Sequence, residues 1–286
     1  MAIVLALLSA LCYGTSDFIG GVLSSRIKPW TAAFTGQLAG GLLLLVIGLS
    51  SDAVLSWSAV GWGAVAGLGG GIGIICLYRG LSTGRMGVVA PLSGVMAALL
   101  PAAVGVLTGD RPSVISWIGM LAALPATWLV ASATDHVPGE ADAETAPRAG
   151  LGEGVVEGLL AGTGFGVSFA ALAQAPQTSG QWPTATELLV AALVAAVGAT
   201  LAREAWVPRT RTALLATSTG VLAAAALAAF LAATHHGMLA AVAVIAALYP
   251  AATVVLAVVV LREHVHRAQA LGLVLCAVAV ALVAGG

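Results

Sequence analysis

Long apolar runs separated by short polar joints dominate this chain. A helix that crosses a bilayer needs about 20 mostly apolar residues, and ten segments meet that measure. They cover residues 2–23, 31–50, 57–81, 86–108, 114–133, 152–175, 184–203, 212–234, 238–260 and 267–285. The runs are too long for the strands of a membrane barrel, and they lack its alternation of apolar and polar residues. The pattern therefore predicts an all-α integral membrane protein with ten transmembrane helices.

The first five predicted helices resemble the last five. A shift of 152 residues places LLSALCYGTSDF (7–18) on LLAGTGFGVSFA (159–170). Matched pairs along the two halves are Leu7/Leu159, Leu8/Leu160, Gly14/Gly166, Ser16/Ser168 and Met86/Met238, with Tyr13 on Phe165 and Tyr78 on Phe230. We therefore divide the chain into a first five-helix repeat (1–133), a polar connector (134–150) and a second five-helix repeat (151–286).

The odd number of helices in each repeat has a geometric consequence. After five crossings, the second copy enters the membrane from the opposite side, so the two copies form an inverted repeat. That architecture is typical of secondary transporters, in which the substrate site lies near the midplane between the repeats. The sequence thus favours a carrier for a small-molecule substrate.

Composition supports a membrane protein and excludes several other classes. Only 8% of the 286 residues are charged, against about 25% in soluble domains. The net charge of −1 offers no basic field for nucleic acid. Cys12, Cys76 and Cys276 lie in apolar runs without the spacing of a disulfide framework or a zinc site. We expect no cofactor and no metal; the expected partners are the lipid bilayer, a substrate and protons, for a monomer or homodimer.

Asp17 is the main candidate for chemistry. It shares a helical face with Tyr13, Ser16 and Gly20. A carboxylate within the membrane costs at least about 2.5–3.5 kcal/mol, so it should face the bundle interior or a wet cavity. It is either a proton- or substrate-binding group or an acid held by a neighbouring helix for structural reasons. The other acids fall at span ends or in loops, so the pattern predicts that Asp17 is the only deep one.

Further polar residues extend the candidate site, each with a plain alternative. Arg79 either pairs with Asp17 or a substrate carboxylate, or reaches to the interface and anchors its helix. Interhelical hydrogen bonds would equally explain isolated polar residues such as Gln37 and Ser93. The full candidate set is Asp17, Tyr13, Ser16, Gln37, Tyr78, Arg79, Ser93, Ser168 and Tyr249. We expect a central cavity lined by the first, third, fourth, sixth, eighth and ninth spans.

The whole pattern resembles the EamA-domain family of the drug/metabolite transporter superfamily. The resemblance rests on the ten spans, the two five-helix repeats and two short motifs. These motifs are the YG-x-S turn of the first span and the step Gly109-Asp110-Arg111-Pro112, whose second copy is Arg262-Glu263-His264. It implies a carrier of the bacterial inner membrane that exports small metabolites or drugs by alternating access, often driven by an ion gradient. An intramembrane enzyme would need a paired acid and base or a metal set within the bundle, whereas the sequence offers one deep carboxylate, so we expect no enzyme.

Three points stay open at this stage. An uncoupled facilitator or a lipid-linked flippase of the same fold would carry the same pattern. Of the eleven Lys and Arg residues, ten lie at odd-numbered joints, which places both termini outside the cytoplasm, whereas the resemblance implies cytoplasmic termini. Arg262 also stands where the family has a glycine before the acid.

Overall fold

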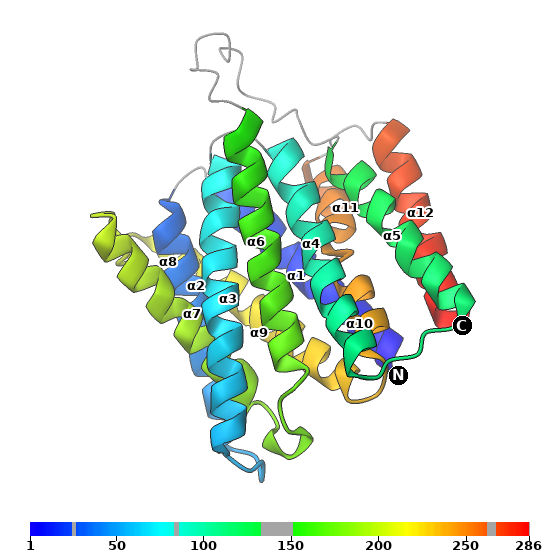
Figure 1. The fold of residues 1–286 in the computed structure, drawn as a ribbon. Helices are drawn as coiled ribbons and strands as arrows, with labels where there is room; N and C mark the ends of the chain where they lie inside the picture. The colour runs from blue at the N-terminus through cyan, green and yellow to red at the C-terminus, as the bar shows by residue number, and fades with distance from the viewer. Residues whose placement is uncertain (25–26, 83–85, 133–150, 262–266, 286) are drawn as a thin grey trace.

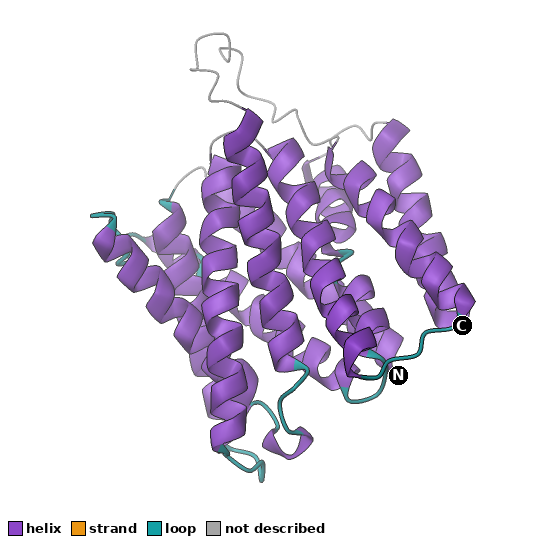
Figure 2. Ribbon diagram, in the orientation of Figure 1, coloured by secondary structure: helices purple, strands orange, loops and turns teal. Residues whose placement is uncertain are grey.

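A computed structural model describes residues 1–24, 27–82, 86–132, 151–261 and 267–285, and these residues form helices joined by loops, with no strand among them (Figures 1 and 2). The helices are α1 (Ala2–Ser24), α2 (Pro29–Leu49), α3 (Trp57–Ser82), α4 (Met86–Thr108), α5 (Val114–Ser132), α6 (Leu151–Leu172), η1 (Gln177–Ser179), α7 (Trp182–Leu201), α8 (Arg211–Leu215), α9 (Thr217–Thr234), α10 (Leu239–Ala246), α11 (Tyr249–Leu261) and α12 (Arg267–Gly285). The all-helical prediction is confirmed for the described chain.

Eight helical segments of the described residues are long and apolar enough to cross a membrane. Two of them combine neighbouring helices, α8 with α9 and α10 with α11. The segments predicted at 86–108 and 114–133 form α4 and α5, and apolar stretches of these helices lie at Leu92–Thr108 and Val114–Val130. The chain is a multi-pass membrane protein.

Glycines allow several helices to approach until their backbones touch. A Cβ on Gly220 of α9 would collide with the Gly36 carbonyl of α2, and Gly164 of α6 faces Gly69 of α3 in the same way. Helices without a strong hydrophobic force between them associate through such small residues. The bundle is therefore held by close backbone contact as well as by side-chain packing.

The contacts also fix how the helices run. Gly69 and Gly73 of α3 meet successively earlier residues of α6, so α3 and α6 are antiparallel. The start of α1 lies at the end of α9, where Gly237 meets Ala2, and these helices are antiparallel too. Further antiparallel pairs are α2 with α7, and α5 with α12. In Figure 1, α6 descends from the end at which α1 finishes.

Two predicted spans are broken by short non-helical steps. The ninth ends one helix at Ala246 and begins the next at Tyr249, followed by Pro250. Proline has no N–H to continue the preceding helical ladder. The eighth breaks at Ala216, where the hydroxyls of Thr217, Ser218 and Thr219 donate to the Leu214, Leu215 and Ala216 carbonyls. Those side chains satisfy backbone groups that apolar surroundings would leave without partners.

The Gly109–Pro112 step links the two halves of the chain. Gly109 has φ +126°, a left-handed conformation that suits glycine. The Asp110 carboxylate then accepts a hydrogen bond from the Ala240 amide (2.8 Å) and so caps the start of α10. The connector 134–150 and the second step at 262–264 lie outside the described residues.

Candidate functional site

A cavity of about 730 Å³, a volume that includes its opening, lies where the helices of the two halves meet. Its lining comes from seven helices: Tyr13, Ser16, Asp17, Ala32, Ala33, Gly36, Gln37, Gly70, Ile74, Tyr78, Phe165, Ser168, Phe169, Glu187, Leu188, Thr219, Gly220, Ala223, Leu227 and Tyr249. The lining is mostly apolar with a few convergent polar groups, which is the usual composition of a small-molecule site.

α1 brings Asp17 to one wall of this cavity. The neighbouring Ser16 hydroxyl donates to the Thr219 carbonyl (3.1 Å) and fixes this part of α1 against α9. The Tyr78 and Tyr249 hydroxyls lie within electrostatic range of the Asp17 carboxylate. Within the described residues, no hydrogen-bond donor or cation contacts that carboxylate. Asp17 is thus an acid in a largely apolar cavity, and its carboxylate is available to bind a proton or a ligand.

A second acid, Glu187, lines the same cavity, contrary to the prediction that Asp17 is the only deep one. Its side chain is 4% exposed. The Ser168 hydroxyl donates a short hydrogen bond to Glu187 Oε1, while Oε2 is buried without a partner in the described structure. Gly70 of α3 has no side chain, and this leaves room for the Glu187 carboxylate. A Cβ on Gly70 would lie only 3.3 Å from Glu187 Oε1.

Sequence reasoning placed Glu187 near a helix end and therefore overlooked it. The span was predicted from residue 184, whereas α7 begins at Trp182. The Trp182 ring packs on Gly48 of α2 and its indole N–H donates to the Ala53 carbonyl (3.3 Å), so this helix start is covered by protein. Glu187 is the one charged residue between 182 and 201, and that isolation was the available signal.

Aromatic rings line the same cavity as the two acids. Tyr13 lies within electrostatic range of both carboxylates. Its ring is 5.9 Å from that of Phe169 and 6.3 Å from that of Tyr249. Phe169 in turn stacks on Phe230 at 4.5 Å. These rings give the cavity rigid apolar walls, with hydroxyl groups from the tyrosines.

The structure gathers seven of the nine predicted site residues in this lining: Tyr13, Ser16, Asp17, Gln37, Tyr78, Ser168 and Tyr249. The Gln37 side-chain oxygen is buried without a partner in the described structure. Ser93 is fully buried in α4 beside Tyr249, behind the lining. Arg79 is exposed, and it lines a separate hollow with Lys28 and Glu204. Of the two interpretations of Arg79, this exposed position fits the one in which its side chain reaches outward at the end of the helix.

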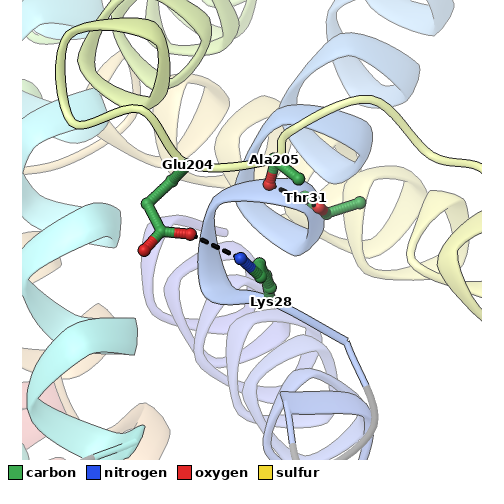
Figure 3. A network of polar contacts seen from close by, with 4 residues as sticks. All are labelled: Lys28, Thr31, Glu204 and Ala205. Carbon is green, nitrogen blue, oxygen red and sulfur yellow. Dashed lines mark hydrogen bonds and ion pairs between the residues drawn. The ribbon is translucent and has the colours of Figure 1, made fainter.

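The helices around the cavity also differ from the prediction. α2 and α7 contribute lining residues, whereas the described side chains of α4 contribute none. Beyond the cavity, the start of α2 and the end of α7 are tied together by an ion pair between Lys28 and Glu204 (2.7 Å) and by a hydrogen bond from Thr31 to the Ala205 carbonyl (3.0 Å), shown in Figure 3. These contacts thus hold the start of α2 against the segment that follows α7.

The described lining holds two carboxyl groups and no Lys, Arg or His. Charges act strongly in such a setting, because little water is present to screen them. The cavity can therefore bind a proton or a cationic group on Asp17, with tyrosine hydroxyls and the Gln37 amide available for further hydrogen bonds.

Comparison with known proteins gives a consistent result. The model of the EamA-like transporter family matches residues 1–132 and 152–285. Among curated proteins, none has a significant match to this chain. A solved structure described only as "Crystal structure of protein" aligns with a TM-score of 0.74 and 17% identity, over 99% of this chain and 98% of its own. At that identity the likeness establishes the fold alone.

Proposed function

Because the chain belongs to the EamA-like transporter family, within the drug/metabolite transporter superfamily, we propose that it is a secondary transporter of the bacterial inner membrane. It exports small metabolites or drugs by alternating access, and the exchange of a proton on Asp17 drives the export. The observation that carries this proposal is the cavity between the two halves, with an acid from the first half and another from the second.

The helix pairs support ten spans arranged as an inverted repeat. Exchanging the two halves replaces the pair α1 and α9 by the pair α6 and α3, and both pairs are antiparallel and closely packed. The same exchange puts α2 in the place of α7 and α5 in the place of α12, so each of these two pairs is unchanged. The helices of each pair are antiparallel. A two-fold axis in the membrane plane produces this arrangement, which is common in transporters that rock around a central site.

The broken ninth span supports the position of the binding site. Tyr249 stands at the break between α10 and α11 and lines the cavity. Discontinuous helices commonly form the substrate site of secondary transporters, because the break exposes backbone groups near the midplane. Asp17 and Glu187 line the same cavity as Tyr249, which supports a shared binding site at this break.

Transport by purified protein in proteoliposomes tests the proposal. We expect Asp17→Asn to abolish flux driven by a pH gradient, because an amide cannot bind and release the coupling proton. The control is Asp52→Asn, which removes an exposed acid outside the cavity. Flux that ignores a dissipated pH gradient, or that survives in Asp17→Asn, would assign the protein to the uncoupled facilitators or flippases of the same fold.

A further inference from the structure

We propose that the cavity takes a small organic cation, that Asp17 binds its ammonium group, and that Glu187 accepts a hydrogen bond from the opposite end of the same molecule. The inference deepens the proposed function and rests on it for movement of the ligand across the membrane. Binding itself depends only on the geometry of the cavity.

The first support is the charge of the lining. Asp17 and Glu187 face a space to which the described residues contribute no cation. A buried carboxylate needs an opposite charge or hydrogen-bond donors to offset its lost hydration. An anionic substrate would add a third negative group, whereas an organic cation supplies the missing charge. The lining therefore selects by sign.

The second support is the state of Glu187. Ser168 holds one carboxyl oxygen in place, and the other oxygen is buried without a partner in the described structure. An acceptor fixed in this way is preorganised for a donor on a ligand. Buried polar groups are nearly always paired, and the cavity is the space from which a donor can approach Glu187.

The third support is that the two acids lie next to different positions along α3. Gly20 of α1, one turn after Asp17, lies against Tyr78 near the end of α3, and Glu187 lies beside Gly70. These two positions on α3 are eight residues apart, which corresponds to about 12 Å along the helix. One elongated molecule can thus reach both acids, and two separate small ions are not required to explain them.

The aromatic rings complete the recognition. Tyr13, Tyr78 and Tyr249 line the cavity together with both acids. Tyrosine faces attract organic ammonium groups within about 6 Å of the ring centroid, and Phe165 and Phe169 offer apolar contact to the body of a ligand. A primary amine on an aromatic or alkyl body matches these features.

Equilibrium binding to the full-length protein in lipid nanodiscs tests the inference, by calorimetry at pH 7, where primary amines are protonated. The probes are 2-phenylethylamine, its uncharged counterpart 2-phenylethanol, and tyramine, which adds a hydroxyl donor at the far end. We expect the amine to bind roughly tenfold or more tightly than the alcohol, as for hydrogen bonds to charged groups. Tyramine should bind more tightly than 2-phenylethylamine.

The variants separate the roles of the two acids. Asp17→Asn should weaken both amines roughly tenfold or more, and Asp52→Asn should leave binding unchanged. Glu187→Gln should prefer tyramine over 2-phenylethylamine less than the wild-type protein does, because a neutral amide oxygen is a weaker acceptor than the fixed carboxylate. If Glu187→Gln fails to fold, Glu187→Asp takes its place. Aspartate retains the charge but withdraws the carboxylate from the ligand, so tyramine should again lose part of its higher affinity relative to 2-phenylethylamine.

Each alternative result counts against the inference. Equal affinity for the amine and the alcohol, no amine binding to the wild-type protein, unchanged affinity in Asp17→Asn, or a full tyramine advantage in the Glu187 variants would overturn it. Flux of [³H]tyramine into proteoliposomes separates this inference from the proposed function. Binding without flux contradicts the transporter, whereas flux of an uncharged or anionic solute without amine binding contradicts only the cation site.

Discussion

Two serines at matching positions of the repeats have different partners, and this difference gives Glu187 its setting. Ser16 and Ser168 coincide under the shift of 152 residues. Ser16 donates to a backbone carbonyl at Thr219, whereas Ser168 donates to the Glu187 carboxylate. The matching position to Asp17 in the second half is Phe169, which stacks on Phe230. The two halves of the sequence therefore match at this serine and differ in where each carries its acid.

We predict that Ser168→Ala destabilises the protein by about 1–3 kcal/mol, the typical loss when a buried group keeps no hydrogen-bond partner. Glu187 then has both carboxyl oxygens without a donor. In a double-mutant cycle measured by thermal unfolding in detergent, Ser168→Ala combined with Glu187→Gln should cost less than the sum of the single changes. Contacting residues are expected to couple in this way.

Ser16→Ala is the matched control for that cycle. It also removes a buried serine hydroxyl from the cavity wall, but its partner is a carbonyl of α9. Its effect should add to that of Glu187→Gln without coupling. Equal coupling in the two cycles would show that the Ser168–Glu187 bond contributes nothing specific.

Most candidate residues could be predicted from the sequence because polar groups are rare in these helices and share one face. Asp17 with Tyr13 and Ser16 is such a case, and the structure places all three in the cavity. Glu187 was missed because depth in the membrane depends on what covers a helix start, which sequence spacing does not contain. Arg79 was ambiguous for a related reason, since a long side chain near a helix end can turn either inward or outward.

At the scale of helices, the close approach of α2 and α9 is the contact most sensitive to added volume. Gly36, Gly40 and Gly220 bring these two backbones together next to the cavity. We predict that Gly220→Ala separates the helices, and that the variant unfolds at a temperature several degrees lower, because overpacking in a tight contact costs about 1–3 kcal/mol.

Gly61→Ala provides the control for the Gly220 variant. No atom lies within 4 Å of a Cβ built on Gly61, and alanine is favoured over glycine in a helix by about 1 kcal/mol. Its unfolding temperature should be equal to that of the wild type or higher. If Gly220→Ala matched Gly61→Ala in the same assay, the backbone contact would have no part in stability.

Helix positions were predictable to within about three residues, because length and hydropathy are the signals that a bilayer imposes. The breaks inside the eighth and ninth spans were not predicted as breaks. An uninterrupted apolar run contains no sign of where its backbone hydrogen bonds stop, apart from Pro250 and the hydroxyl cluster at 217–219. Those residues mark both breaks, since each either removes a donor or replaces a backbone partner.

At the scale of the whole molecule, polar contacts join α2 and α7 at both ends of the pair. Lys28 and Thr31 contact the chain after α7 at one end. At the other, Val54 donates to the Thr178 carbonyl (2.9 Å) and Trp182 to the Ala53 carbonyl. The Lys28–Glu204 pair is 58% and 42% exposed, so it stabilises this contact by no more than about 1 kcal/mol. A contact of this strength can break in each cycle of the proposed transport.

A reversible cross-link across this end tests whether opening is required. The variant carries Lys28→Cys and Glu204→Cys in a chain whose Cys12, Cys76 and Cys276 are replaced by serine. We predict that its flux falls at least about tenfold when a short bifunctional thiol reagent joins the two new cysteines. Such a loss is expected where a contact must open for product release. Reductant should restore the flux, and either single cysteine treated with the reagent should remain active.

Ligand binding to the cross-linked protein shows whether the cavity stays accessible when flux is blocked. The cross-link lies outside the cavity, so a ligand that enters from the opposite end should still bind at equilibrium even though it cannot cross. Loss of flux with retained binding would show that this end opens in every cycle, as an inverted repeat requires when its halves exchange conformations. Normal flux through the cross-linked protein would contradict that requirement and place the moving contact elsewhere in the bundle.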